Sequence, residues 1–437
     1  MKVSSLVLDT GDTTWIILAG SLVFLMIPAL ALFEAGLLRK KNAVSVFMQI
    51  FFGLGFLSLM WFIFGFSMAF GPDQSGLIGG SDFAFLKGVP WDDPLEEFAP
   101  TIPGMTFVQF QMVVAVVTPL LLTGVIAERM KFSSFIIFIA AWSIFIYYPL
   151  VHWVWGGGWL AQLGVADFAG GIVIHASAGM SALAAAIVLG RRKDFGPAIM
   201  VPHNIPLAVF GASLLWLGWF GFNAGSALAA GGIAANTIMV THLSSSAAAL
   251  VWIGLSWKRT GKPSVVSGIN GALAGLVGIT PAAGFVSVEH AVLIGLGIGF
   301  ASYAGLVIFK ERLRIDDALD VSAVHGVAGI VGSLSVGIFA SAVINPDGPV
   351  GALFGNVAQF GSQLLGVGVA IALGFGGTFI IMKIIKAVTG VRVSEKVEDA
   401  GLDIGEHAEE AYADEEEYKL GDKEYKLGKD KSKKFKN

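Results

Sequence analysis

Residues 167–179 read DFAGGIVIHASAG, and they begin an apolar run that spans residues 171–190. At 1.5 Å per residue this run is long enough to cross a hydrocarbon core of about 30 Å. It ends on a basic triplet at 191–193, so Asp167 lies at one membrane boundary and His175 lies one to two turns further in. A titratable ring in lipid is costly, which makes an intramembrane histidine a candidate functional residue. For a single histidine, a hydrogen bond to a neighbouring helix is the alternative explanation.

A second stretch also places an acid shortly before a histidine. Residues 320–330 read DVSAVHGVAGI, so Asp320 precedes His325 at the start of another apolar helix. Two buried histidines on separate helices indicate a pathway through the membrane, and they make two unrelated hydrogen bonds a poorer explanation.

The composition is that of a polytopic membrane protein. Of the 437 residues 55% are hydrophobic, and the absence of cysteine excludes disulfides, thiolate metal sites and cysteine nucleophiles. We predict an all-α polytopic membrane protein with eleven transmembrane helices, because eleven apolar segments are long enough to span a bilayer. These segments are 14–38, 43–70, 105–127, 133–151, 171–190, 204–229, 233–257, 265–284, 289–309, 318–341 and 358–386.

The basic residues predict how these helices are oriented. Fourteen Lys and Arg residues follow odd-numbered helices, whereas the opposite side has only Lys2 and Lys87. By the positive-inside rule the basic side is cytoplasmic, so the N-terminus is outside and the C-terminus is cytoplasmic. We expect a multi-pass protein of the cell membrane. The fourteen residues are Arg39, Lys40, Lys41, Arg129, Lys131, Arg191, Arg192, Lys193, Lys258, Arg259, Lys262, Lys310, Arg312 and Arg314.

The two acid–histidine stretches predict an inverted repeat. Asp167 precedes helix 5 on the outside and Asp320 opens helix 10 on the inside, so helices 1–5 and helices 6–10 have opposite topologies. In such a 5+5 repeat the binding site lies where the two halves meet. His175 and His325 would contribute one ring from each half, and helix 11 would be a peripheral brace.

The chain divides into three parts by its character. Residues 1–388 form the transmembrane domain, 389–412 form a cytoplasmic segment, and 413–437 form a charged tail that we predict to be disordered. The mixture of Arg, Glu, Asp and spaced apolar residues in the second part favours docking on the basic inner loops over insertion into lipid.

An aromatic site is expected at the outer end of helix 4. Trp155 is followed by three glycines, which let the backbone approach a ligand closely. An indole face at the boundary between water and membrane suits cation–π binding of a small cation. Tryptophans at this depth also anchor proteins in the interface, and we assign that role to Trp153 and Trp159.

Several other polar residues have two possible roles. Phe222 and Ser226 share a helix face, and they predict either a hydroxyl acceptor above an apolar constriction or packed aromatics with a serine bonded to its own helix. Asp167 can attract a cation or cap helix 5, and we expect capping as its direct contact. Glu34 and Glu128 lie beside basic residues at helix ends, so we expect ordinary ion pairs there.

The motifs together resemble those of the Amt/Mep/Rh ammonium transporter family, on its Amt branch. The similarity covers nearly the whole chain except its charged end. It is carried by FEAGLLRKKN at 33–42, AERMKF at 127–132, WGGG at 155–158, DFAGG at 167–171 with His175, GWFGFNAGS at 218–226, DVSAVHG at 320–326, and the segment 390–412.

The resemblance implies an eleven-helix transporter that assembles as a homotrimer with one pore in each subunit. It implies an external ammonium recruitment site made by Trp155 and Ser226, with Phe110 beside them and Asp167 supporting the site electrostatically. It also implies that the segment at 390–412 packs under the bundle and couples the three pores. A PII-type signal protein, GlnK, would block the pore mouths from the cytoplasm.

The resemblance further implies an apolar gate and a pore. Phe222 would be one gate phenyl, and His175, His325 and Trp219 would line the pore below it. The position of the family's other gate phenyl is Val114 in this chain. The gate is therefore expected to be incomplete, unless Phe110 compensates.

The chemistry of ammonium explains why such a pore would select it. Ammonium has the size and charge of potassium, so size cannot separate the two ions. Ammonium can lose a proton, and neutral ammonia crosses a narrow apolar pore at a much lower desolvation cost than an ion. Adjacent imidazoles offer donor and acceptor nitrogens and can relay the proton. The residues leave open whether the proton crosses as well.

Two other functions remain as alternatives. Paired histidines on facing helices also ligate haem in membrane electron carriers, although small residues flank this pair and no porphyrin pocket is evident. An ammonium sensor of the same fold would signal through its C-terminal segment, in which we recognise no catalytic domain. Otherwise the pattern predicts a transporter and not an enzyme, with no cofactor, no metal ion and no nucleic-acid partner.

Overall fold

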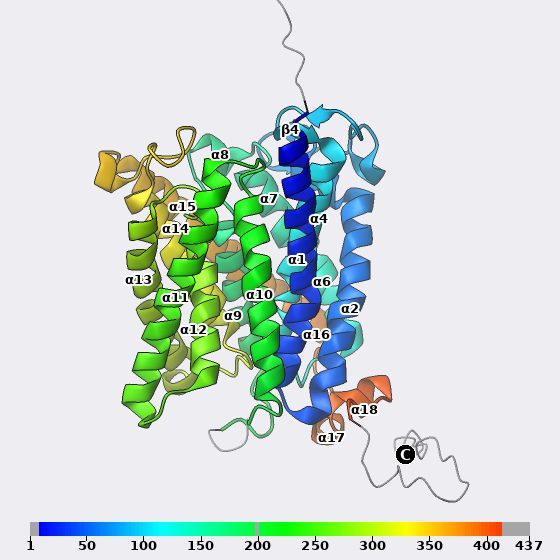
Figure 1. The fold of residues 1–437 in the computed structure, drawn as a ribbon. Coiled ribbons are helices and arrows are strands. Elements are labelled where there is room, and N and C mark those ends of the chain that lie inside the picture. The colour runs from blue at the N-terminus through cyan, green and yellow to red at the C-terminus, as the bar shows by residue number, and fades with distance from the viewer. Residues whose placement is uncertain (1–7, 197–200, 413–437) are drawn as a thin grey trace, which may run out of the picture.

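The computed structural model describes residues 8–196 and 201–412, so the predicted disorder of the charged tail at 413–437 lies outside the described residues. Within the described ranges, ten helices are long and apolar enough to cross a membrane, and the shorter apolar helix α12 (Val265–Ile279) makes an eleventh. They lie side by side in one bundle (Figure 1). The expected polytopic helical fold is confirmed, and each of the eleven predicted segments coincides with one of these helices.

The first five crossing segments contain α1 (Thr10–Leu37), α2 and α3 (Ala43–Met60, Phe66–Phe70), α4 and α5 (Gly104–Leu120, Thr123–Ile126), α6 and α7 (Phe132–Trp142, Tyr148–Val154) and α9 (Ser177–Leu189). The next six contain α10 (Ile205–Gly225), α11 (Gly232–Thr260), α12, α13 (Val288–Leu306), α14 (Ala328–Phe339), and α15 and α16 (Ala358–Ile371, Thr378–Val388).

Short elements cap the two ends of the bundle. One end carries α8 (Trp159–Gln162), a 3₁₀ turn (Ala84–Leu86) and two small hairpins, β1–β2 (Asp73–Gln74, Ile78–Gly79) and β3–β4 (Pro94–Leu95, Ala99–Pro103). The other end carries α17 (Glu395–Ala400) and α18 (Leu402–His407), which lie under the bundle (Figure 1).

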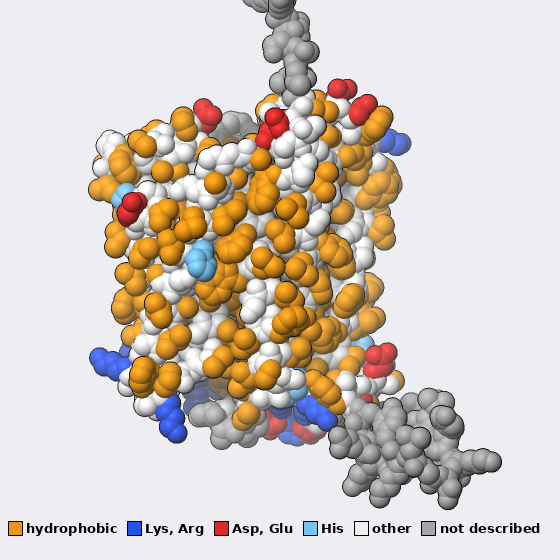
Figure 2. Space-filling view, in the orientation of Figure 1, with side chains coloured by type: hydrophobic (Ala, Val, Ile, Leu, Met, Phe, Trp, Pro, Cys, Tyr) orange, Lys and Arg blue, Asp and Glu red, His pale blue; other side chains and the backbone are white. Residues whose placement is uncertain are grey.

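The surface has the layering that a bilayer requires. On the face shown in Figure 2, apolar side chains cover the middle, and Lys and Arg gather at the end that carries α17 and α18. Charged groups at the ends and a belt of apolar side chains between the ends are typical of a bundle that spans a membrane.

Both candidate histidines lie in π-helical turns. His175 is in η5 (Gly171–Ala176), which leads into α9, and His325 is in η7 (Ser322–Val327), which leads into α14. A π-turn contains an extra residue relative to an α-helical turn, and such turns often occur at functional sites. Here each π-turn changes the direction in which one histidine side chain points from an otherwise regular apolar helix.

The two histidine-bearing helices touch backbone to backbone. A Cβ atom placed on Gly179 would lie 2.0 Å from the backbone nitrogen of Gly326, so only glycine fits at position 179. Because Gly326 directly follows His325, this contact fixes the height at which the two helices cross. The crossing therefore brings the two imidazole rings to the same level.

Candidate functional site

Four cavities form a series through the bundle. The outer cavity has a volume of about 280 Å³, and a pore cavity of about 30 Å³ surrounds the histidines. A third cavity of about 20 Å³ shares His325 with the pore cavity, and a fourth of about 130 Å³ lies at the end that carries α17 and shares Asn270 with the third. Phe222 lines the pore cavity one helical turn from Ser226, which lines the outer one.

The outer cavity brings together four of the residues predicted from the sequence. Trp155, Phe110, Ser226 and Val114 all line it. The Trp155 Nε1–H donates to the carbonyl oxygen of Asp167 at 2.8 Å, which holds the edge of the indole and leaves its face for packing. An indole face of this kind can attract a small cation.

The hydroxyl of Ser226 is partly used by its own helix. Its Oγ–H donates to the carbonyl oxygen of Phe222 at 3.0 Å, which was the alternative expected from the sequence. A hydroxyl that donates its hydrogen still has oxygen lone pairs, so Ser226 can accept an N–H from a ligand in the outer cavity. The two roles are therefore compatible.

Asp167 caps the helix that carries His175. Its Oδ1 accepts from the N–H groups of Gly170 and Gly171 at 2.9 and 2.7 Å, and its Oδ2 accepts from Ile172 and Val173 at 2.7 and 3.0 Å. Burial raises the pKa of this carboxyl, and the four N–H donors oppose that shift. Asp167 thus acts as a helix cap.

The pore cavity is built around the two histidines. The Nδ1 atoms of His175 and His325 are 3.3 Å apart, within hydrogen-bonding distance. The ring of His175 stacks on Trp219, with centroids 5.6 Å apart, and the centroid of Phe222 lies 6.2 Å from that of His175. Trp219 is itself held by its Nε1–H, which donates to Thr280 Oγ1 at 3.0 Å.

Asp320 directly precedes the helix that carries His325, as expected, but the carboxylate that corresponds to that of Asp167 in the second half is Asp317. Asp317 Oδ2 accepts from the N–H of Ser322 at 2.6 Å, five residues further on, as Asp167 does from Ile172. Asp320 has a left-handed backbone with φ of 62°, and its carboxylate pairs with Lys310 at 2.6 Å. Burial and the neighbouring Asp320 raise the pKa of Asp317 to about 6.

Within residues 8–196 and 201–412, Glu34 has no ion pair, contrary to the prediction. Its Oε2 accepts from Thr123 Oγ1 at 2.8 Å, and the residue is 2% exposed. Among the described residues no Lys, Arg or His side chain pairs with it, because Arg39 turns instead to Glu128. Glu34 lines the third cavity together with His325 and Asn270.

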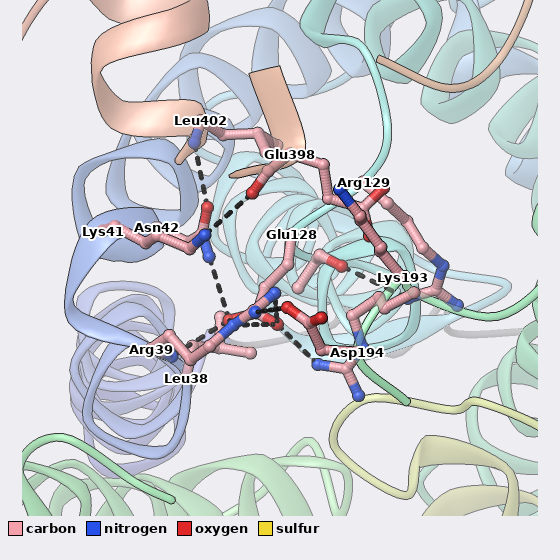
Figure 3. Close-up of polar contacts among 12 residues, drawn as sticks. Leu38, Arg39, Lys41, Asn42, Glu128, Arg129, Lys193, Asp194, Glu398 and Leu402 are labelled. Carbon is pink, nitrogen blue, oxygen red and sulfur yellow. Dashed lines mark hydrogen bonds and ion pairs between the residues drawn. The ribbon is translucent and has the colours of Figure 1, made fainter. Parts of the chain in front are cut away.

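Glu128 is the centre of a buried ionic cluster at the end that carries α17 (Figure 3). It accepts from Arg192 Nη1 at 2.7 Å, from Arg39 Nε at 3.0 Å and from Asn42 Nδ2 at 3.0 Å. Although burial opposes ionisation, Arg192 and Arg39 hold the pKa of Glu128 at about 2. Arg192 also pairs with Asp316 at 2.6 Å, so the predicted ion pairing of Glu128 is confirmed.

The C-terminal segment is attached to this cluster. Asn42 Oδ1 accepts from the N–H of Leu402 at 2.9 Å, and Glu398 Oε1 accepts from the N–H of Lys193 at 2.8 Å (Figure 3). Asp403 accepts from the N–H of Ser45 at 2.8 Å, at the start of α2. The segment therefore contacts the loops that follow the first and fifth crossing helices.

The model of the Ammonium Transporter Family matches residues 14–412, a range that contains the four cavities and the C-terminal helices. The chain belongs to the ammonium transporter family. Ammonium transporter 1 of Dictyostelium discoideum is 52% identical to it over 92% of this chain and 88% of the relative. Ammonium transporter Amt1 of Archaeoglobus fulgidus is 45% identical over 93% of this chain and 100% of the relative.

Solved structures of the same family have the same fold. The Sensor Amt Protein superposes with a TM-score of 0.84 at 33% identity and covers 93% of this chain and 100% of its own. Mep2 of Saccharomyces cerevisiae superposes with a TM-score of 0.82 at 34% identity and covers 89% of this chain and 88% of its own. The predicted Amt/Mep/Rh resemblance is thereby confirmed.

The positions of three side chains bear on the apolar gate that the resemblance to the ammonium transporter family implies. Phe222 lines the pore cavity, whereas Phe110 and Val114 line the outer cavity. The ring contacts of Phe222 are with His175 and Trp219, so Phe110 does not stack on it as a second gate phenyl. Val114, where the resemblance implies a second gate phenyl, lines the outer cavity.

The haem alternative does not fit the geometry of this ammonium transporter. The two Nδ1 atoms are in direct hydrogen-bonding contact, and the ring centroids are 5.3 Å apart. Haem ligation would require an iron and its macrocycle between the two rings. No such space exists between rings that already touch.

Proposed function

We propose that this ammonium transporter recruits ammonium in the outer cavity, transfers its proton to the histidine pair and conducts neutral ammonia through the pore past Phe222 and the two histidines. The observation that carries the proposal is the hydrogen-bonded histidine pair, which lies in an apolar cavity directly below an aromatic one. Ammonium transport itself follows from membership of the family and from the 52% identity to an ammonium transporter.

The outer cavity supplies the cation site in this proposal. Trp155 offers an indole face and Ser226 a hydroxyl oxygen, while Phe110 contributes a second aromatic wall. The combination of a π-face and one acceptor suits a small cation that carries hydrogens, because the π-face attracts the charge and the oxygen accepts one N–H. Asp167 acts from behind, through the carbonyl oxygen that orients the indole.

The pore cavity then discriminates by protonation. Its walls are aliphatic and aromatic apart from the two imidazoles, and its volume of about 30 Å³ leaves no room for the water shell of an ion. Potassium would have to give up that shell without compensation, whereas ammonium escapes the cost by leaving its proton behind. The pore therefore passes ammonia and rejects potassium.

The histidine pair offers a route for that proton. A single hydrogen lies between the two Nδ1 atoms, so one ring donates and the other accepts. When a proton binds to Nε2 of His175, the hydrogen shared by the two Nδ1 atoms can move to His325. His325 can then release a proton from its own Nε2. His175 Nε2 is buried and has no protein partner among the described residues, which leaves it available to the pore.

The test is an ammonium pulse applied to proteoliposomes that contain the purified transporter. Internal pH and membrane current are recorded together. We expect a rise in internal pH if ammonia alone crosses, and a current if the proton crosses as well, with no response to an equal potassium pulse. A potassium current as large as the ammonium current would overturn the proposed selection.

The same proposal includes the membrane in which the transporter lies and its orientation there. The loops rich in Lys and Arg lie at the end that carries α17 and α18, so the positive-inside rule assigns that end to the cytoplasm and the outer cavity to the exterior. We place the protein in the cell membrane, with the N-terminus outside. Protease added to intact cells should cut a tag at the N-terminus and spare one at the C-terminus.

Assembly and regulation are also part of the proposal. The family resemblance favours a homotrimer with a pore in each subunit, and a PII-type protein such as GlnK that closes the cytoplasmic mouths. Contacts of Glu398 and Asp403 with inner loops support a role of the C-terminal segment in coupling the pores. Mass measurement of the purified complex in detergent tests the trimer, and a pull-down with GlnK tests the partner.

A sensor is the second candidate, because the structure of a Sensor Amt Protein superposes on this chain at 33% identity. Identities of 45% and 52% to proteins described as ammonium transporters favour transport. Ammonium binding without measurable flux in the proteoliposome assay would favour the sensor.

A further inference from the structure

In the part of the chain that the structure describes, no cation compensates the carboxyl group of Glu34, which lies in the membrane domain. It is contributed by α1, lines the third cavity and accepts a hydrogen bond from Thr123 of α5. An uncompensated carboxylate at membrane depth is costly, so such groups mark functional pathways unless they are needed for packing. The helices α2, α4 and α10 that pack against α1 carry no charged side chain.

The third cavity connects this carboxyl group to the histidine pair. His325, Glu34 and Asn270 all line it, and its volume of about 20 Å³ is enough for one water molecule. A water there would have three polar partners, which is the number that buried waters usually have. His325 and Glu34 can therefore exchange a proton through a single water.

The local hydrogen bonds accommodate both protonation states of Glu34. Thr123 Oγ1 lies 2.8 Å from Glu34 Oε2 and 2.5 Å from the carbonyl oxygen of Leu120. The hydroxyl has one hydrogen, so it either donates to an ionised Glu34 or turns to Leu120 and accepts from a protonated one. The backbone N–H of Gly124 supplies a further hydrogen bond to the carboxylate.

The fourth cavity continues the route towards the cytoplasmic end. It shares Asn270 and Leu319 with the third cavity, and it is lined by Arg39, Glu128, Arg192, Lys310 and Asp320. His325 is the titratable side chain that lines the third cavity with Glu34, and these charged groups line the fourth cavity beyond it. A proton released into the fourth cavity meets a polar, ionic environment in which it can be hydrated.

We infer that Glu34 is the proton acceptor at the inner end of the pore, which lets the transporter carry the proton as well as ammonia. Ammonium leaves its proton on the histidine pair and becomes ammonia. The imidazolium of His325 gives a proton to the bridging water, and the water gives one to the Glu34 carboxylate, so His325 becomes neutral. The resulting carboxylic acid releases the proton to water in the fourth cavity. The net event is one ammonium moved and one positive charge moved.

This inference rests on the proposed function, and the experiment separates the two. Uptake of labelled methylammonium and membrane current are measured in the same proteoliposomes, and their ratio gives the charge moved per substrate. We expect one charge per methylammonium for the natural protein and a ratio near zero for Glu34→Gln. Glu34→Asp should restore most of the ratio, and Glu289→Gln, which removes an exposed carboxyl at the start of α13, should leave it unchanged.

Each outcome has a distinct meaning. Absence of methylammonium uptake by the natural protein would overturn the proposed function. Uptake without charge in the natural protein would overturn the role of Glu34 and leave ammonia conduction standing. A ratio unchanged in Glu34→Gln would also overturn it, because a carboxyl needed only for packing would alter the amount of folded protein and not the charge per substrate.

A second variant covers the case in which Glu34→Gln does not fold. Thr123→Val removes the hydroxyl that donates to the ionised carboxylate and keeps the volume of the side chain. The carboxyl should then hold its proton more tightly, so the internal pH that gives half-maximal current should move upwards. An unchanged pH profile in a well-folded Thr123→Val protein would contradict the inference.

Discussion

His175 and His325 are joined through their Nδ1 atoms, 3.3 Å apart, although they are 150 positions apart in the sequence. The other nitrogen of His175, Nε2, is buried and has no hydrogen-bond partner among the described residues. The pair is held from two sides, by the stacking of Trp219 on His175 and by the close approach of Gly179 to Gly326. A chemical function of the pair can therefore be tested with little risk of losing the fold.

Replacing either histidine with alanine should slow or abolish ammonium flux, or open the pore to potassium. Proton transfer by a positioned side chain contributes about 100-fold or more to a rate, so a loss of that order is expected for the proton-linked current. Flux and potassium leak in proteoliposomes are the measurement. Normal ammonium flux with full exclusion of potassium in both single variants would rule out the pore role.

Trp155→Leu should weaken the apparent affinity for ammonium more than it weakens folding. The substitution removes the indole face that lines the outer cavity but keeps apolar bulk. A cation–π contact contributes about 0.5–2 kcal/mol, so the half-saturation concentration should rise by up to about 30-fold. Concentration series with labelled methylammonium measure it, and Trp153→Leu, which changes a tryptophan outside the cavity, is the matched control.

Glu128→Gln should destabilise the transporter by about 3–5 kcal/mol, because Arg39 and Arg192 would lose a buried shared partner. Thermal unfolding in detergent at neutral pH measures the effect, with the exposed Glu289→Gln as a control. Equal unfolding temperatures for the two variants would show that the cluster contributes little.

The same cluster predicts an acid limit to stability. The pKa of Glu128 is about 2 in the folded chain, below its ordinary value of 4.5, so the ionised form favours folding. Its contribution of about 3 kcal/mol is complete above pH 4.5 and is lost as the pH falls towards 2. Unfolding temperatures measured across this range should fall less steeply for Glu128→Gln than for the natural protein.

Two truncations should differ in their effect on transport. Removing residues 413–437 should leave flux nearly intact, whereas removing residues 390–437 should reduce it sharply without preventing membrane insertion. The longer deletion takes away Glu398, Leu402 and Asp403, which bind the inner loops. If the two truncated proteins transported ammonium equally, the coupling role of the segment would be wrong.

Much of the fold and of the outer and pore sites followed from the sequence alone, because the period and length of apolar runs determine where helices cross. Trp155, Ser226, His175 and His325 were found because aromatic, hydroxyl and imidazole groups are conspicuous at membrane depth. Their mutual distances were beyond prediction, since these depend on a helix crossing set by two glycines far apart in the chain.

Two features of the polar residues could not be read from the sequence. Asp320 precedes the helix that carries His325, but the carboxylate that accepts from the N–H of Ser322 at the start of that helix is Asp317. Glu34 was expected to form an ion pair because basic residues follow it closely in the sequence. The helix α1 ends at Leu37, and Arg39 beyond it pairs with Glu128 on another segment instead.

The spacing between each capping aspartate and its histidine sets a limit on how the chain can vary in length. Asp167 precedes His175 by the same interval by which Asp317 precedes His325, and each carboxylate pins the start of its helix. One inserted residue in either interval would rotate the following side chain by about 100° around the helix axis and turn the imidazole away from its partner. The external loops can accept added residues, but the number of residues between each aspartate and its histidine has to stay the same.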